Sequence, residues 1–472
     1  MFTRRVMGVE TEFGVTAFRD GSQVLSPEEV ARYLFRPVVS AHRSSNIFVD
    51  NASRLYLDVG AHPEYATAEC DSITQLLNSD KAGELIFDRL SRTAEEALAA
   101  DRIGGEIYLF KNNVDSRGNS YGAHENYLIS RELALKPFSV QLMPHMITRQ
   151  LICGAGLIKK NRFVISQRAD QVWEGVSSAT TRTRPIINTR DEPHGDSHRF
   201  RRMHVIVGDS NMAEPTFALK IGSTLLVIEM LEAGFAMPNF ELDNPIEHIR
   251  DISADPTGAT VLRLKDGSAA TALEVQRGIF EAARAWLAQR PDEGTPNAEM
   301  ARVVDLWGRT LDAIETKDFS GVDQEIDWVI KRKLLEQFKT RLGCDWDHPK
   351  LAHVDLAYHD IRRERGLFYH LQRKGLVKRW TTDEAIEQAT TTAPRTTRAA
   401  LRGRFLAAAR ESGASVNVDW VHLKVNHPEP RTVALFDPFA TDGEASADVE
   451  KLVEYMLENH PVSYTHLRAH ET

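Results

Sequence analysis

Residues 51–71 read Asn-Ala-Ser-Arg-Leu-Tyr-Leu-Asp-Val-Gly-Ala-His-Pro-Glu-Tyr-Ala-Thr-Ala-Glu-Cys-Asp, with strict apolar–polar alternation between positions 54 and 59. Because successive side chains of a strand point to opposite faces, this alternation predicts a half-buried strand. Its apolar face would carry Leu55, Leu57 and Val59, and its polar face Arg54, Tyr56 and Asp58. Such a polar face is either a solvated strand surface or part of a binding site, and this segment alone does not decide between them.

A second strand of the same kind begins the chain, in Arg-Val-Met-Gly-Val-Glu-Thr-Glu-Phe-Gly at residues 5–14. Glu10 and Glu12 lie two residues apart and therefore share a face. Two neighbouring carboxylates repel each other unless a cation or water compensates them. Oxygen-rich sites led by carboxylates suit Mg²⁺, which commonly also binds substrate phosphates. Together with the polar face of residues 54–58 and with Glu64, this strand predicts a surface for a metal ion and a nucleotide.

The composition of the 472-residue chain is that of an ordinary globular protein, with 42% hydrophobic and 26% charged residues. This length exceeds one average domain, so a large and a small domain are expected. A net charge of −9 gives no reason to expect a nucleic-acid partner. No apolar run approaches the roughly 20 residues that span a bilayer, and no apolar leader follows the first arginines. Cys70, Cys153 and Cys344 form no paired motif, which favours a reducing compartment. We therefore expect a cytoplasmic protein without a membrane partner.

Further along the chain, two segments carry polar side chains on one strand face. His124 and Asn126 share a face of the strand expected at 124–129, where the histidine either has a functional role or is satisfied by strand-edge hydrogen bonds. Arg202 and His204 share a face of the strand expected at 201–209. Because guanidinium groups bind oxyanions bidentately, this pair suits a polyphosphate.

The remaining sequence predicts mostly helices, with a small unit at the C-terminal end. Helical spacing runs through 72–100, 212–234, 271–290 and 299–342. A threonine-rich stretch at 390–397 marks the expected domain boundary. Beyond it we expect a helix at 398–412, one strand at 415–423 that contains Trp420, and a helix at 446–458.

Several of these segments resemble the Pup–protein ligase family. The resemblance covers residues 1 to about 460, and it is carried by Met-Gly-Val-Glu-Thr-Glu-Phe-Gly at 7–14, the segment at 54–71, Leu-Phe-Lys-Asn-Asn-Val-Asp-Ser at 109–116, Gly-Ala-His-Glu-Asn-Tyr at 122–127, Ile-Ile-Asn-Thr-Arg-Asp-Glu-Pro-His at 186–194 and His-Val-Ile-Val-Gly-Asp-Ser-Asn-Met at 204–212. It implies an α+β fold: a glutamine synthetase-like large domain with a curved antiparallel sheet packed on helices, and a small C-terminal α/β domain. The expected boundaries are 1–395 for the carboxylate–amine ligase domain, 396–460 for the small domain, and 461–472 for a non-native or disordered tail, which does not resemble the family.

The resemblance also implies a reaction. ATP would phosphorylate the side-chain carboxylate of the C-terminal glutamate of Pup, a prokaryotic ubiquitin-like protein, and a lysine of a target protein would then attack the acyl phosphate. The family's positions carry over to Glu10, Tyr56 and Glu64 as ligands of Mg²⁺ (with Glu12 as an additional candidate), to Arg54, Thr67 and Trp420 as ATP contacts, and to Asp58 as the catalytic base. A buried structural role is the alternative for Trp420.

Three other functions remain to be weighed against ligation. The depupylase branch of the family is a hydrolase on the same scaffold, but it typically carries a long insertion where this chain has only residues 15–51. A ligase for small molecules would form product without Pup. A non-catalytic adaptor that binds Pup would turn over no ATP, and it is disfavoured because Glu10, Arg54, Tyr56, Asp58 and Glu64 are all present.

Overall fold

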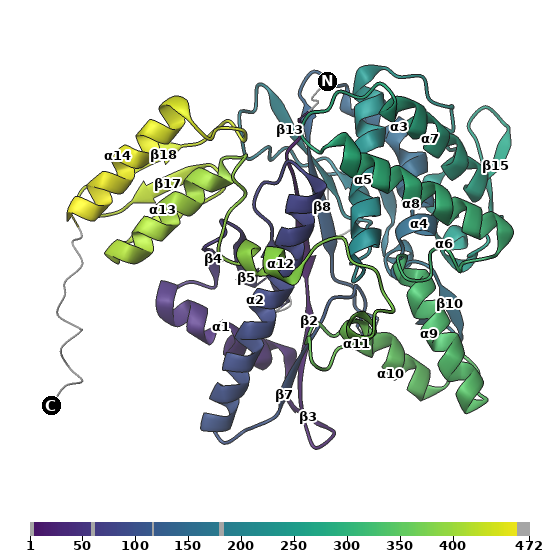
Figure 1. Ribbon diagram of the computed structural model, residues 1–472, viewed down its shortest axis with the longest axis horizontal. Helices are drawn as coiled ribbons and strands as arrows, with labels where there is room; N and C mark the ends of the chain where they lie inside the picture. Colours follow the sequence, from purple (N-terminus) through teal and green to yellow (C-terminus); the bar gives the residue numbers. More distant parts are fainter. Residues whose placement is uncertain (1–3, 58–61, 116–117, 179–183, 460–472) are drawn as a thin grey trace.

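A central mixed sheet of eight strands organises the computed structural model, which describes residues 4–57, 62–115, 118–178 and 184–459 (Figure 1). In spatial order its strands are β11 (Glu174–Ser177), β12 (Pro185–Asn188), β13 (Phe200–Val205), β8 (Ala123–Ser130), β1 (Met7–Glu12), β6 (Pro63–Ala66), β5 (Arg54–Leu57) and β4 (Asn46–Phe48). All neighbours are antiparallel except β11 and β12, which are parallel. The fold is α+β, as the sequence predicts.

The strand register brings the two predicted polar strands onto one face of this sheet. Glu10 lies opposite Ala66 on one side and His124 on the other, and Glu12 lies opposite Glu64. Tyr56 in turn lies opposite Glu64 on its other side. Because directly opposed residues of neighbouring strands project to the same side, the carboxylates of β1 and β6 share a face with the polar residues of β5.

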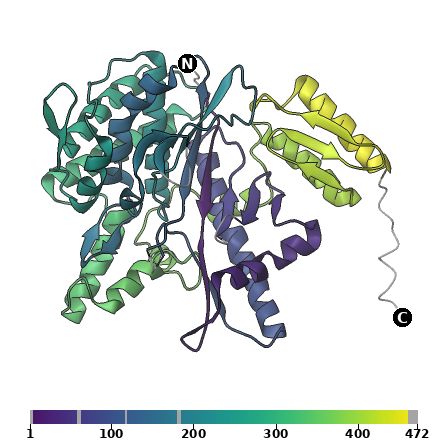
Figure 2. The ribbon, with the colours of Figure 1, turned by 180° about the vertical axis from the view of Figure 1, so that it is seen from behind.

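The other face of the sheet packs on a large helical core that contains Val9, Tyr127, Met203 and Val205 (Figures 1 and 2). The helices of this core are α3 (Leu135–Thr148), α4 (Gln150–Cys153), α5 (Glu214–Ala233), α6 (Pro245–Ala254), α7 (Ala272–Leu287) and α8 (Asn297–Thr316). Helix α5 is apolar around most of its circumference and is buried over nearly its whole length. It is therefore a central helix with neighbours on every side.

A second core covers the same side of the sheet under β5 and β6, and it includes Leu55, Tyr65 and Phe87. Its elements are α1 (Pro27–His42), α2 (Ile73–Ala100) and a three-stranded sheet of β3 (Ser22–Leu25), β2 (Gly14–Arg19) and β7 (Glu106–Phe110). The long helix predicted at 72–100 is thus confirmed. After Phe13, the chain of β1, which carries Glu10 and Glu12, continues into this smaller sheet as β2.

The helical region predicted at 299–342 is divided into α8 and α9 (Asp327–Leu342). Helix α8 stops where Lys317 adopts a left-handed conformation with φ of 60°. The Asp318 side chain then accepts a hydrogen bond from the Ser320 amide at 3.0 Å, which stabilises a turn. The apolar spacing is continuous across 299–342 and therefore does not reveal the turn at which the helix ends.

Smaller elements complete this part of the chain. They are β9 (Leu157–Lys159), β10 (Arg162–Val164), a 3₁₀ helix (Ala169–Gln171), β14 (Val261–Arg263), β15 (Ala269–Thr271), α10 (Pro349–Ala357), α11 (Leu367–Arg373) and α12 (Asp383–Ala389). Within the described part of the chain, none of the helices has both the length and the apolar character that crossing a membrane requires.

The last elements are α13 (Ala399–Ser412), β16 (Val416–Val418), β17 (His422–Val425), β18 (Arg431–Ala434) and α14 (Gly443–Asn459). They share a hydrophobic cluster of their own, which includes Phe405, Leu423 and Met456 (Figure 1, yellow-green to yellow). The single strand predicted at 415–423 is wrong, because β16 and β17 form a hairpin. The carboxylate of Asp419 accepts the amides of Val421 and His422, each at 2.7 Å, and so closes a turn that contains Trp420.

A buried ion pair joins the central sheet to the helices beneath it. The carboxylate of Glu125 on β8 accepts both terminal nitrogens of Arg149, at 2.8 and 2.6 Å, and the Tyr127 hydroxyl at 2.7 Å. Burial raises the pKa of Glu125, but the charge and hydrogen bonds of Arg149 outweigh burial and hold this pKa below its usual value. The ionised carboxylate is therefore the form that the folded protein favours.

This pair generates a prediction about pH. We expect Glu125→Gln to lower the free energy of unfolding at pH 7 by about 3–5 kcal/mol, because it leaves Arg149 buried without a counter-charge. A group whose pKa is lower in the folded state stabilises above its unfolded pKa of about 4.3 and loses that effect as the pH falls. The difference between wild type and variant should therefore shrink below about pH 4, as measured by urea unfolding between pH 3 and 8. A difference that does not change with pH would contradict the ionised pair.

Candidate active site

The polar face of the central sheet gathers side chains from seven neighbouring strands. These side chains are Asn188, Arg202 and His204, then His124 and Asn126, then Glu10 and Glu12, then Glu64, then Arg54 and Tyr56, and finally Asn46. We call this set the polar floor. Its carboxylates come from β1 and β6, and its cationic and imidazole groups flank them on both sides.

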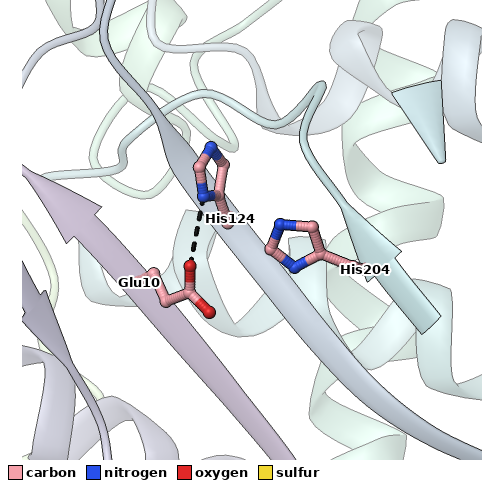
Figure 3. Close-up of side chains that lie close together, drawn as sticks. All are labelled: Glu10, His124 and His204. Atoms are coloured by element: carbon pink, nitrogen blue, oxygen red, sulfur yellow. Dashed lines mark hydrogen bonds and ion pairs between the residues drawn. The ribbon is translucent and has the colours of Figure 1, made fainter. Parts of the chain in front are cut away.

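At one part of the polar floor, Glu10, His124 and His204 lie so close that one ligand atom from each is within 4.8 Å of the others (Figure 3). The Glu10 carboxylate is 3.2 Å from the Nδ1 of His124 and accepts a hydrogen bond from the Asn126 amide at 2.9 Å. The guanidinium of Arg202 lies 3.7 Å from it. One carboxylate thus lies among three basic side chains, and this set has the donor atoms of a divalent-metal site.

The protonation states of these groups suit a cation. Burial raises the pKa of Glu10, but the hydrogen bond from His124 and the nearby His204, His124 and Arg202 outweigh it and hold this pKa far below its usual value. Burial lowers the pKa of His204 to about 3, despite the opposing charge of Glu10. At neutral pH the floor therefore presents an ionised carboxylate beside a neutral imidazole.

The Nδ1 of His204 has two polar neighbours. It is 2.8 Å from the side-chain oxygen of Asn126, which only accepts hydrogen bonds, while the amide nitrogen of Asn126 donates to Glu10. It is also 3.3 Å from the Nη1 of Arg202, which only donates. These neighbours orient the ring beside Glu10, as outer partners of metal-binding histidines do.

The second part of the polar floor is rich in oxygen. Glu64 is buried between Glu12 and Tyr56, and the Tyr56 hydroxyl donates a short hydrogen bond to its carboxylate. Burial, followed by the charges of Glu10 and Glu64, raises the pKa of Tyr56 far above its usual value, so the phenol stays protonated. Beside Glu12, the Nδ1 of His62 lies 3.8 Å from the carboxylate. Carboxylate and phenol oxygens are the donor type that Mg²⁺ prefers.

Next to the polar floor lies a pocket that includes two of the three predicted ATP contacts. Thr67 and Trp420 line it, together with Glu10, Arg202, and several backbone and apolar groups. Trp420 projects from the β16–β17 turn and packs edge-on against Phe48 of β4, with ring centroids 4.8 Å apart. The Thr67 hydroxyl accepts the Val9 amide at 3.1 Å and is thereby tied to β1.

The third predicted ATP contact, Arg54, lies on the polar floor but is not among the residues that line this pocket. Its Nε donates to the side chain of Asn46 at 2.6 Å, and its guanidinium lies over the ring of Tyr56 at 4.6 Å. The predicted metal ligands Glu10, Tyr56 and Glu64 all lie on the floor. Asp58, the predicted base, falls in 58–61, outside the described residues.

The sequence predicts that His124 shares a strand face with Asn126, and that His204 shares one with Arg202. It does not predict that either histidine lies near Glu10. That junction depends on β8 pairing with both β1 and β13, across separations of more than 70 residues. The available signal was the alternation of side chains along each strand, which places His124 with Asn126 on one face and Arg202 with His204 on one face. It identifies which side chains share a face, but not which strands become neighbours.

Comparison with known proteins identifies the family of the chain. The family model described as Pup-ligase protein matches residues 5–424. The Pup–protein ligase of Corynebacterium efficiens is 61% identical over 474 residues, which cover 98% of this chain and 96% of that protein. The Pup–protein ligase of Mycolicibacterium vanbaalenii is 57% identical over 457 residues, covering 96% of this chain and all of that protein.

Two solved structures are similar over almost the whole chain. The complex between Pup and its ligase PafA matches with a TM-score of 0.94 and 58% identity, covering 97% of this chain and 94% of that one. The Pup ligase PafA in complex with ADP matches with a TM-score of 0.86 and 60% identity, covering 94% and 95%. Because the family model and these relatives match the chain over almost its whole length, the chain belongs to the Pup–protein ligase family.

Proposed function

We propose that this chain is an ATP-dependent ligase that joins the side-chain carboxylate of the C-terminal glutamate of Pup to a lysine of a target protein, and so marks that protein for the bacterial proteasome. The observation that carries the proposal is the polar floor, where Glu10, Glu12, Glu64 and Tyr56 lie on one face beside a pocket lined by Thr67 and Trp420. Family membership and the ADP and Pup complexes of similar proteins support it.

The chemistry has two steps, and each places a demand on the site. The glutamate carboxylate first attacks the γ-phosphorus of ATP, which gives an acyl phosphate and ADP. The lysine amine then attacks the acyl carbon, an isopeptide bond forms, and phosphate leaves. Both steps crowd negative charge together, so the floor must hold compensating positive charge at fixed positions.

Glu10, Tyr56 and Glu64 would hold Mg²⁺, with Glu12 as an additional ligand and with His124 and His204 added by the structure. When bound, the ion would neutralise phosphate oxygens and orient the transferred group. The donor set fits this role, because the oxygen-rich part of the floor suits Mg²⁺ while the two imidazoles also accept a softer ion such as Mn²⁺. Arg202 lies next to Glu10 and would face the phosphates.

The nucleotide would occupy the pocket next to the floor, with Thr67 and Trp420 in its wall and Arg54 reaching it from the floor. We further propose residues 1–395 as the catalytic domain and 396–460 as a small domain that contributes Trp420. A cytoplasmic location fits the three free cysteines, two of which are buried.

Asp58 is the proposed base for the second step. A lysine with an ordinary pKa of about 10.4 is protonated at neutral pH and does not attack until a base removes its proton. General-base catalysis typically contributes about 10²–10⁴-fold. In the sequence Asp58 follows Leu57, which is the last residue of the strand whose polar face carries Arg54 and Tyr56.

We expect Asp58→Asn to lower the rate of conjugate formation at least about 10²-fold while ADP affinity changes less than about threefold. The assay mixes purified protein, ATP, Mg²⁺, Pup ending in glutamate and a lysine-bearing target, and follows conjugates by gel electrophoresis. Asp448→Asn, which changes a half-exposed carboxylate on α14, is the matched control and should leave the rate unchanged. Near-normal ligation by Asp58→Asn would remove this residue from the mechanism, and loss of preformed conjugate in the wild-type reaction would indicate the hydrolase instead.

The role of the histidines is tested by metal binding. We expect His204→Gln to weaken Mn²⁺ binding in the presence of ADP by about 10-fold or more, as measured by isothermal titration calorimetry, because it removes one imidazole next to Glu10. His353→Gln, an exposed histidine on α10, is the control. Equal Mn²⁺ affinities for the two variants would exclude His204 from the metal site.

A further inference from the structure

One buried carboxylate in the wall of the proposed nucleotide pocket is shared by two arginines. Glu69 is 8% exposed and follows β6 in the chain. Its Oε1 accepts the Nε of Arg398 at 2.7 Å and the Nη2 of Arg402 at 2.7 Å, and its Oε2 accepts the Nη1 of Arg402 at 2.8 Å. Arg402 is wholly buried, so this interaction is shielded from water.

Each arginine that binds Glu69 also donates a hydrogen bond to a backbone carbonyl in another wall of the pocket. Arg398 donates to the carbonyl of His194 at 2.6 Å and to that of Leu435 at 2.7 Å. Arg402 donates to the carbonyl of Trp420 at 2.7 Å. Glu69, His194, Arg398 and Trp420 all line the pocket.

The guanidinium of Arg402 also contacts Trp420 in the pocket wall and Phe48, which packs against Trp420. The Arg402 carbon lies 5.2 Å from the ring centroid of Trp420 and 5.1 Å from that of Phe48. Its Nη1 further donates to the carbonyl of Ala52, in the turn between β4 and β5, at 3.2 Å. Arg402 therefore fixes both the backbone and the ring of Trp420 relative to the central sheet.

These walls come from segments that are far apart in the sequence. Glu69 belongs to the chain after β6, His194 to the loop before β13, and Trp420 to the hairpin of the C-terminal elements. Side chains that are positioned by separate segments keep their arrangement only if something joins the segments. The Glu69–Arg398–Arg402 cluster makes that connection with charge-assisted hydrogen bonds, which are the stronger kind.

We propose that Glu69 is a positioning residue that sets nucleotide affinity, because it holds Arg398 and Arg402, and through them His194 and Trp420, in the wall of the pocket. The inference rests on the proposed function, since it takes this pocket as the nucleotide site. Glu69 does not touch the reacting atoms in this account, so its loss acts on binding of ATP and not on the chemical step.

The test compares Glu69→Gln with a matched change elsewhere. Glutamine keeps the shape of the side chain, but its NH₂ group faces a guanidinium N–H that needs an acceptor. Glu229→Gln is the control, because Glu229 is also buried and accepts Nε and Nη2 of Arg290 at 2.8 and 3.0 Å, yet it lies outside the pocket lining. Both variants should lose thermal stability.

We expect Glu69→Gln to weaken ADP binding at least 10-fold and to raise KM for ATP by a similar factor, while kcat at saturating ATP stays within threefold of wild type. Glu229→Gln should keep ADP affinity within twofold. Arg402→Lys, which retains the charge but loses the forked donor geometry, should reproduce the KM effect with a smaller loss of stability.

Equal ADP affinity in Glu69→Gln and Glu229→Gln would overturn the inference, as would a fall in kcat with KM unchanged. If Glu69→Gln does not fold, Arg402→Lys decides by the same comparison. Wild-type protein that binds no ADP would instead overturn the proposed function, whereas binding by wild type without a difference between the variants would overturn the positioning role alone.

Discussion

Electrostatic repulsion among carboxylates that share one face of a β-sheet is the constraint on which this site depends. Glu10, Glu12 and Glu64 project from neighbouring strands, and two of them lie directly opposite each other. Charges of one sign at this distance destabilise a sheet unless other groups compensate them. Here the compensation is His124, Asn126 and Arg202 around Glu10, and the Tyr56 hydroxyl at Glu64. A protein keeps such an arrangement where a cation completes the balance, and that cation can in turn bind phosphate oxygens.

The opposite face of the same sheet explains how the polar floor stays in place. It is covered by two hydrophobic cores, one with α3, α5 and α8 under β1, β8 and β13, and one with α1 and α2 under β5 and β6. The buried pair of Glu125 and Arg149 ties β8 to these helices. A rigid, close-packed support of this kind positions functional side chains more accurately than loops do.

Much of this arrangement was predictable from the sequence, because side-chain parity is a local property. The alternation at 54–59 and the pair Glu10 and Glu12 predict which side chains share a face of their strand, and the resemblance adds their roles. The pairing of β8 with both β1 and β13 is a long-range property, so the approach of His124 and His204 to Glu10 was not predictable from local pattern. The same holds for the Glu69 cluster, in which Glu69 lies more than 300 residues from both Arg398 and Arg402. The predicted strand at 415–423 failed for a different reason, since the Asp419 side chain creates a turn that apolar alternation does not reveal.

The most direct test of the account is the position of a divalent ion relative to the polar floor. Crystals grown with ADP and Mn²⁺ give an anomalous signal that locates the ion without reference to any assumed ligand. The account predicts a manganese peak within coordination distance of Glu10 or Glu64, with the phosphates of ADP beside it and the adenine ring of ADP next to Trp420. Manganese and ADP bound elsewhere on the protein, with this face of the sheet free of both, would contradict it.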